Sequence, residues 1–363
     1  MTEEKITTGY LILESGEIFE GKLVGNSKGV CGEVVFNTSM TGYQEIMTDP
    51  SYAGQLVVFS YPLIGNYGMN DCYEESVVPH VKGIVTGELC IDPSHFKSNE
   101  TILTMLKKYE IPCLTNVDTR ELVKTIRKKG AIKGVISDEK HFFANDHDNN
   151  NLIDHVVTNK VLTYQNDGPH IILMDFGFKK SILSFLLRSK CKVTIVPYHY
   201  PLEKINALKP DGIIVSNGPG DPMAVGNQLK KIKTLTQNYP TLGICLGHQL
   251  IALAYGAKTR KLPFGHRGGN HPVKELATGK VFITSQNHGY DVIDSTIDEL
   301  QFFVSFKHVN DGTVEGMKHR KLPIITVQFH PEAHPGPTDT EYIFEQFYQL
   351  INQQIGVMQY ALQ

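Results

Sequence analysis

Apolar and polar positions alternate with a clear rhythm in the second half of the chain. Short apolar runs, which predict buried strands, are followed by segments in which apolar residues recur at helical spacing. The expected strands cover residues 170–176, 192–198, 212–216 and 241–245, and the expected helices cover residues 181–190, 202–209, 228–237 and 246–256. Strands that alternate with helices of this length predict an α/β fold around a mostly parallel, doubly wound sheet.

The first part of the chain has a different pattern, with short apolar runs interrupted by glycine, which is typical of strands and hairpins. Helices are expected over residues 101–109 and from Asp118 to Gly130. The N-terminal part is therefore predicted to be mixed and β-rich. The end of the chain is β-rich again, with the Asn-Asp-Gly sequence at 310–312 as a hairpin turn, and a last helix is expected over 340–352.

A polar stretch separates the two parts. Residues 138–168 are rich in Asn and Asp and carry too little apolar surface to bury, so they are typical of a loop. We expect three segments, namely an N-terminal domain over residues 1–150, a linker over residues 151–168 and an α/β domain over residues 169–363. A length of 363 residues agrees with two domains.

Charge and cysteine content limit the classes of function. The formal net charge of -3 leaves no excess positive charge for nucleic acid or an anionic membrane, so neither partner is expected. The start of the sequence lacks a secretory signal, and no apolar run reaches the roughly 20 residues of a membrane helix. The six cysteines are dispersed without a CxxC pair, which favours reduced thiols and a cytoplasmic location.

The segment from Gly243 to Gln249, GICLGHQ, stands where an expected strand passes into a helix. Small residues around Cys245 permit the sharp turn of a G-x-S-x-G nucleophile elbow, with a thiol in place of the hydroxyl. The helix dipole favours a thiolate at this position, and the backbone N–H of Leu246 would face an oxyanion. A lone buried cysteine is more often structural, so the interpretation depends on partner residues.

Those partners are expected in Phe329-His330-Pro331-Glu332, close behind the apolar run IITV. Histidine serves as both base and acid at neutral pH, so His330 could take the thiol proton and protonate the leaving amine. Glu332 could orient the imidazole and stabilise its charged form. Cys245, His330 and Glu332 are therefore the predicted catalytic residues.

A third motif, SNGPGDP at residues 216–222, begins at the end of an expected strand. Glycines around a proline give a stiff loop with exposed amides that can donate to an oxyanion, although such a sequence alone more often forms an ordinary turn. The carboxyl ends of strands are where open α/β sheets bind ligands, which favours a functional loop.

SNGPGDP, GICLGHQ and FHPE, in this order, resemble the class I (triad) glutamine amidotransferase family over residues 170–355. The resemblance implies that Cys245 attacks the side-chain amide of L-glutamine, that ammonia leaves, and that water hydrolyses the resulting glutamyl thioester. Gly218 and Leu246 match the residues of that family whose N–H groups form the oxyanion hole.

The rest of the chain resembles the small-subunit family of carbamoyl phosphate synthetase, and residues 36–68, 117–134, 266–273 and 285–292 carry that resemblance. It implies a glutaminase that delivers ammonia to a large synthetase subunit, for arginine or pyrimidine biosynthesis. It also implies a set of glutamine-binding residues, which are Ser51, Gly218, Gly220, Leu246, Gln249, Asn287, Gly289 and Tyr290.

No cofactor is expected in this chain, because the resemblance assigns ATP and Mg²⁺ to the large subunit and the sequence lacks G-x-G-x-x-G and P-loop motifs. No metal is expected either, since His266, His271, His330 and His334 lack close ligand spacing and a metal on His330 would occupy the catalytic base. Two alternatives stay open at this point. The chain could be the amidotransferase component of another biosynthetic synthetase, or a non-catalytic regulatory homologue.

Overall fold

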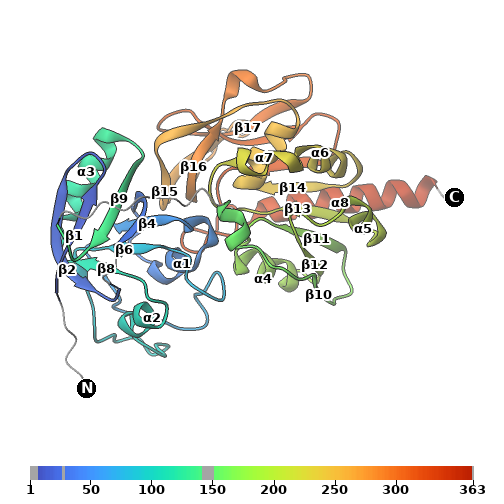
Figure 1. Cartoon of the computed structure of the whole chain (residues 1–363). Helices are drawn as coiled ribbons and strands as arrows, with labels where there is room; N and C mark the ends of the chain where they lie inside the picture. Colours follow the sequence, from blue (N-terminus) through green and yellow to red (C-terminus); the bar gives the residue numbers. More distant parts are fainter. Residues whose placement is uncertain (1–6, 27–28, 141–150, 362–363) are drawn as a thin grey trace. The chain divides into compact units, whose positions relative to one another are not determined.

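The computed structural model describes residues 7–26, 29–140 and 151–361, and the side chains of residues 355–361 are not discussed. The chain divides into two compact units (Figure 1). Unit 1 holds residues up to 150 together with residues 262–268, and unit 2 holds residues 151–261 and 269–363. Residues 262–268, which we expected in the α/β domain, thus group with unit 1.

Unit 1 is built around a closed barrel with the strand order β1-β2-β8-β6-β4-β3-β9. The barrel mixes antiparallel pairs, such as β1 with β2, and parallel pairs, such as β3 with β4. Its strands are β1 (Thr7–Leu13), β2 (Ile18–Val24), β3 (Val30–Asn37), β4 (Gln55–Phe59), β6 (Gly83–Val85), β8 (Cys113–Thr115) and β9 (Ile132–Ser137), while β5 (Leu63–Ile64) and β7 (Glu88–Leu89) form a separate pair.

Short helices pack on the barrel of unit 1. They are α1 (Tyr43–Thr48), the 3-10 helix η1 (Pro50–Tyr52), α2 (Ile102–Lys108) and α3 (Thr119–Lys129). The carboxylate of Asp118 caps α3 by accepting from the N–H of Glu121, and Gly130 ends the helix with a positive φ. The two helices predicted from sequence in this part are confirmed, as is its mixed, β-rich character.

Unit 2 contains a ten-stranded sheet with the order β10-β12-β11-β13-β14-β19-β18-β17-β15-β16. Its central strands β12, β11, β13, β14 and β19 run parallel to their neighbours in this group. The strands are β10 (Leu162–Tyr164), β11 (His170–Asp175), β12 (Lys192–Pro197), β13 (Gly212–Val215), β14 (Thr241–Ile244), β15 (Thr259–Glu275), β16 (Val281–Val292), β17 (Phe302–His308), β18 (Val314–His319) and β19 (Ile324–Val327).

Helices cover both faces of this sheet. They are η2 (Leu152–His155), α4 (Lys180–Arg188), α5 (Leu202–Ala207), η3 (Pro222–Gln228), α6 (Leu229–Asn238), α7 (Leu246–Ala254), η4 (Asp294–Thr296) and α8 (Tyr342–Ala361). Alternate residues of β11 enter different cores, since Ile172 and Met174 pack with α6 and α7 whereas Ile171 and Leu173 pack with α4 and α8 (Figure 1). A strand buried on both faces explains the continuous apolar runs, and the predicted α/β fold class is confirmed.

The segment expected to be a linker, residues 151–168, carries regular structure. Residues 152–155 form η2, and β10 pairs antiparallel with β12 at the edge of the sheet. All three residues of β10 are exposed, so the pairing left no apolar signal in the sequence. Residues 145–150, the most Asn- and Asp-rich part, lie outside the described residues.

The hairpin turn and the last helix predicted near the end of the chain are both present. The predicted turn at residues 310–312 does join β17 and β18, which pair antiparallel, and the last helix continues to Ala361, beyond its predicted end. Among the described residues, none of the helices combines the length and apolar character of a membrane span.

Candidate active site

Four loops meet at one edge of the sheet in unit 2, because the strands before them, β11, β13, β14 and β19, are parallel and adjacent. Lys179 follows β11, the SNGPGDP loop follows β13, Cys245 follows β14 and His330 follows β19. Motifs that are far apart in the sequence therefore converge at the carboxyl edge, which is where ligands bind in open α/β sheets.

Cys245 occupies a strained turn between β14 and α7, with a φ of 52° and a ψ of -104°. Its N–H donates to the carbonyl of Val327 at 2.8 Å, which fixes the turn to β19. A Cβ at Gly247 would lie 2.0 Å from the carbonyl oxygen of Val215, so only glycine permits the close packing of α7 on β13. A non-glycine residue at positive φ held in this way is typical of a functional elbow.

The thiol of Cys245 is buried, and its hydrogen bonds include one to β16 and one from the residue that follows β19. Its Sγ donates to the carbonyl oxygen of Asn287 at 3.7 Å, and Nε2 of Gln328 donates to Sγ at 3.6 Å. Gln328 was not predicted as a site residue. Its position as the second residue of VQFHPE offered the only sequence signal, because side chains just beyond a central parallel strand reach the same sheet edge.

His330 and Glu332 form a buried pair in which Nδ1 of the imidazole lies 2.6 Å from Oε1 of the carboxylate. The N–H of His330 donates to the carbonyl of Ser285 at 2.9 Å, which sets the backbone at this point. Burial works against a charged imidazole, but the carboxylate of Glu332 and the thiol of Cys245 outweigh it and raise the pKa of His330. A carboxylate therefore holds the ring with Nδ1 protonated and stabilises the imidazolium.

Lys179 is a third charged member of this cluster, and sequence reasoning missed it. Its Nζ lies 3.3 Å from Oε1 of Glu332 and also donates to the carbonyl of Ala333, and the side chain is fully buried. Burial alone would raise the pKa of Glu332, but Lys179 and His330 outweigh it and lower that pKa. Glu332 is thus held as a carboxylate between two cations.

The SNGPGDP loop is anchored at its start and exposed at its end. The hydroxyl of Ser216 accepts from the N–H of Phe176 at 3.0 Å, and the amide of Asn217 donates to the carbonyl of Gly177 at 3.0 Å. A Cβ at Gly218 would lie 2.2 Å from the carbonyl oxygen of Phe176, so glycine is required here. Gly220 has a φ of 85°, which also favours glycine. The oxyanion role of the Gly218 and Leu246 N–H groups stays a prediction.

The other predicted glutamine-binding residues of unit 2 lie in α7 and β16. Nε2 of Gln249 donates to the carbonyl of Tyr290 at 2.9 Å and to Oε1 of Gln328 at 3.0 Å. This amide therefore joins α7 to both β16 and the end of β19. Asn287 contacts the thiol through its carbonyl, and Gly289 lies between Asn287 and Tyr290 on β16.

Ser51 lies in unit 1, in η1, where its N–H donates to Oδ1 of Asp49 at 2.9 Å. The Asp49 side chain thus caps this short helix and fixes the backbone at Ser51. The role of Ser51 in binding glutamine stays a prediction.

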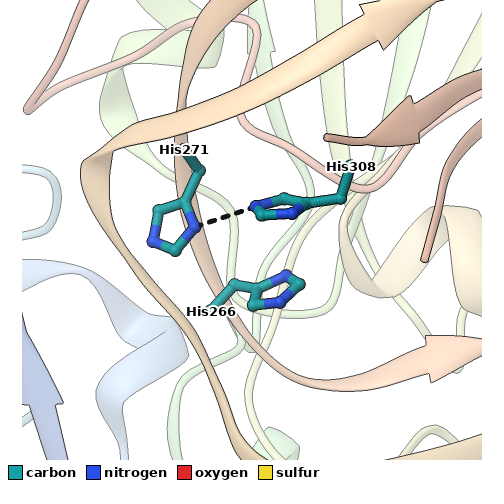
Figure 2. A group of neighbouring side chains, drawn as sticks. All are labelled: His266, His271 and His308. Atoms are coloured by element: carbon teal, nitrogen blue, oxygen red, sulfur yellow. Dashed lines mark hydrogen bonds between the residues drawn. The ribbon is translucent and has the colours of Figure 1, made fainter. Parts of the chain in front are cut away.

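Two of the histidines that sequence reasoning considered for a metal, His266 and His271, belong with His308 to one group of neighbouring side chains (Figure 2). His330 pairs with Glu332, whereas Nδ1 of His271 on β15 lies 3.2 Å from Nε2 of His308 on β17 (Figure 2). Nδ1 of His308 accepts from the N–H of Asn310, so in the neutral ring Nε2 carries the proton and donates to His271. His266 lies on the part of β15 that belongs to unit 1.

Comparison with known proteins separates the chain into the same two parts. Residues 172–350 match the family described as Glutamine amidotransferase class-I, and residues 11–136 match the Carbamoyl-phosphate synthase small chain, CPSase domain. The fold and the elbow thiol beside a buried His–Glu pair define unit 2 as a class-I glutamine amidotransferase domain.

Relatives that match nearly the whole chain identify the family more closely. The chain is 50% identical to the Carbamoyl phosphate synthase arginine-specific small chain of Bacillus subtilis, over 93% of this chain and 96% of the relative. It is 49% identical to the pyrimidine-specific small chain of the same organism, over 94% of this chain and 95% of the relative. It is 46% identical to the Carbamoyl phosphate synthase small chain of Listeria monocytogenes, over 96% of this chain and 98% of the relative. The chain belongs to the family of carbamoyl phosphate synthase small chains, and it is a glutamine amidotransferase.

Proposed function

We propose that this chain hydrolyses glutamine at Cys245 and delivers the ammonia to the large chain of a carbamoyl phosphate synthase. The observation that carries the proposal is the strained elbow at Cys245 beside the 2.6 Å contact of His330 with Glu332. This arrangement supplies a nucleophile, a proton carrier and an orienting carboxylate within one buried site.

In the proposed reaction, Sγ of Cys245 attacks the carboxamide carbon of glutamine while His330 takes the thiol proton. The N–H groups of Gly218 and Leu246 donate to the oxyanion that develops on the amide oxygen. The carbon–nitrogen bond then breaks, and the proton on His330 passes to the departing ammonia. Water, deprotonated by His330, attacks the glutamyl thioester and releases glutamate with the thiol restored.

The small-chain domain that matches residues 11–136 supports a large-chain partner and argues against the amidotransferases of other synthetases. We infer that ATP and Mg²⁺ act in the partner, that this chain needs no cofactor, and that the complex works in the cytoplasm. Identities of 50% and 49% to the arginine-specific and pyrimidine-specific relatives of one organism support both biosynthetic destinations equally.

The test uses Cys245→Ser in the full chain, purified with its large chain. Glutamine-dependent carbamoyl phosphate synthesis should vanish, while synthesis from added ammonium should persist at the wild-type rate, because only the ammonia source has been removed. Equal loss of both activities would contradict the division of labour between the chains. A wild-type chain that releases no glutamate at all would support the non-catalytic homologue instead.

A further inference from the structure

One side chain of β16 reaches across to the SNGPGDP loop. The hydroxyl of Tyr290 donates to Oδ2 of Asp221 at 3.2 Å. The two residues are 69 positions apart in the sequence, and the bond lies at the surface. Asp221 comes three residues after Gly218, whose N–H we assign to the oxyanion.

Tyr290 is held firmly on its backbone side. Its carbonyl accepts from Nε2 of Gln249 at 2.9 Å and from Nδ1 of His288 at 2.8 Å. Gln249 lies on α7, one turn beyond Cys245, so the tyrosine backbone is tied to the helix that carries the nucleophile. The Tyr290 side chain therefore extends from a fixed point.

Asp221 receives the bond at the free end of the loop. Its Oδ1 already accepts from the N–H of Met223 at 2.8 Å and so caps η3, which leaves Oδ2 to accept from the tyrosine. Ser216 and Asn217 are buried, whereas Gly220 and Asp221 are exposed. The loop is thus anchored at its start by buried bonds and at its end by this surface bond.

We propose that the Tyr290 hydroxyl is a positioning group, which ties the oxyanion loop to the nucleophile helix through Asp221 and so fixes the Gly218 N–H for the transition state. The inference rests on the proposed function, because it assigns a task within glutamine hydrolysis. An oxyanion develops only in the transition state, so a loosened donor lowers kcat and leaves KM nearly unchanged.

The experiment measures glutamate release by the full chain and the variants Tyr290→Phe, Asp221→Ala and the double variant. Tyr290→Phe keeps the ring and removes one surface hydrogen bond, so kcat should fall about three- to tenfold with KM within about twofold of wild type. If both side chains act through one bond, the double variant should be no slower than Asp221→Ala alone. Tyr239→Phe is the matched control, since it removes a hydroxyl that donates to Asn206 at 3.1 Å between α5 and α6, and it should leave kcat unchanged.

Three outcomes would overturn the inference while leaving the proposed function in place. The first is an unchanged kcat in Tyr290→Phe. The second is a rise in KM alone in that variant, which would mean that the hydroxyl touches glutamine. The third is a fall in kcat in the double variant that equals the product of the falls in the two single variants. A wild-type chain that releases no glutamate would overturn the proposed function and the inference together.

Discussion

Two fully buried histidines of unit 2 differ in what surrounds them. His330 faces the carboxylate of Glu332 at 2.6 Å, and its pKa is raised. His248 on α7, three residues after Cys245, has Thr326 as its neighbour, with Nδ1 2.8 Å from the hydroxyl, and burial lowers its pKa to about 3. Closeness to Cys245 along the sequence therefore does not by itself raise the pKa of a histidine.

The difference shows that burial by itself makes a neutral, structural imidazole. An adjacent carboxylate reverses the effect, because the attraction of opposite charges in a buried site exceeds the desolvation of the ring. Lys179 keeps that carboxylate charged from its other side. The charges of Lys179, Glu332 and His330 therefore distinguish the surroundings of His330 from those of His248.

The largest difference between the two histidines is expected when each is replaced in turn by asparagine. His330→Asn should lower glutamate release by about a thousandfold or more, because in the proposed mechanism Cys245 loses its base and the leaving amine loses its acid. His248→Asn should keep most of the activity. Steady-state kinetics with glutamine decide the matter, and comparable losses in the two variants would show that His330 has no special role.

A second prediction concerns the carboxylate itself. Glu332→Gln should lower kcat/KM by about 10- to 100-fold, and it should move the alkaline limb of the pH profile to lower pH, because the amide no longer raises the pKa of His330. Lys179→Met removes a charge that lowers the same pKa, so its alkaline limb should move to higher pH. Limbs that stay at the wild-type position in both variants would refute the electrostatic account.

The smallest expected effect lies in the pH dependence of stability. The pKa of His248 falls from 6.5 to about 3 on folding, so the unfolded chain binds more protons between these values and stability falls as the pH decreases. At pH 5 the loss is about 2 kcal/mol. The raised pKa of His330 has the opposite effect on stability. The protonated His330 contributes its full stabilisation of the folded chain below pH 6.5, the pKa in the unfolded chain, and this contribution is lost as the pH rises through the pKa in the folded chain.

Urea unfolding across pH 4.5 to 10 measures these opposite slopes. His248→Asn should flatten the acidic side of the stability curve alone, and His330→Asn the alkaline side alone. An acidic slope that persists in His248→Asn would mean that another group takes up the proton.

The local pattern of residues in the sequence was sufficient to predict many of the strands and helices. Continuous apolar runs predicted the parallel strands because β11 is buried on both faces, and Asp118 and Gly130 marked the ends of α3 because capping is a local interaction. The closed barrel of unit 1 could not be predicted in this way. Its order places β8 between β2 and β6, and such pairings depend on contacts between distant segments.

The candidate site shows the same limit. The motifs around Cys245 and His330 carry their chemistry within a few residues each, so the sequence predicted them together. Lys179 has no such motif, and its importance arises from a 3.3 Å contact with a residue 153 positions further along the chain (332 minus 179). The bond of Tyr290 to Asp221 likewise depends on how strand β16 packs against the SNGPGDP loop, which is distant in sequence.

If Cys245 is the nucleophile of glutamine hydrolysis, as we propose, it forms a glutamyl thioester during turnover, and this thioester can be trapped. The full chain is mixed with glutamine, quenched in acid during turnover and digested, and the peptide that contains Cys245 is weighed by mass spectrometry. We expect one added glutamyl group on Cys245 in the wild-type chain and none at this position in Cys245→Ser. Glutamate release without this adduct, or a glutamyl group on another residue, would contradict the proposal.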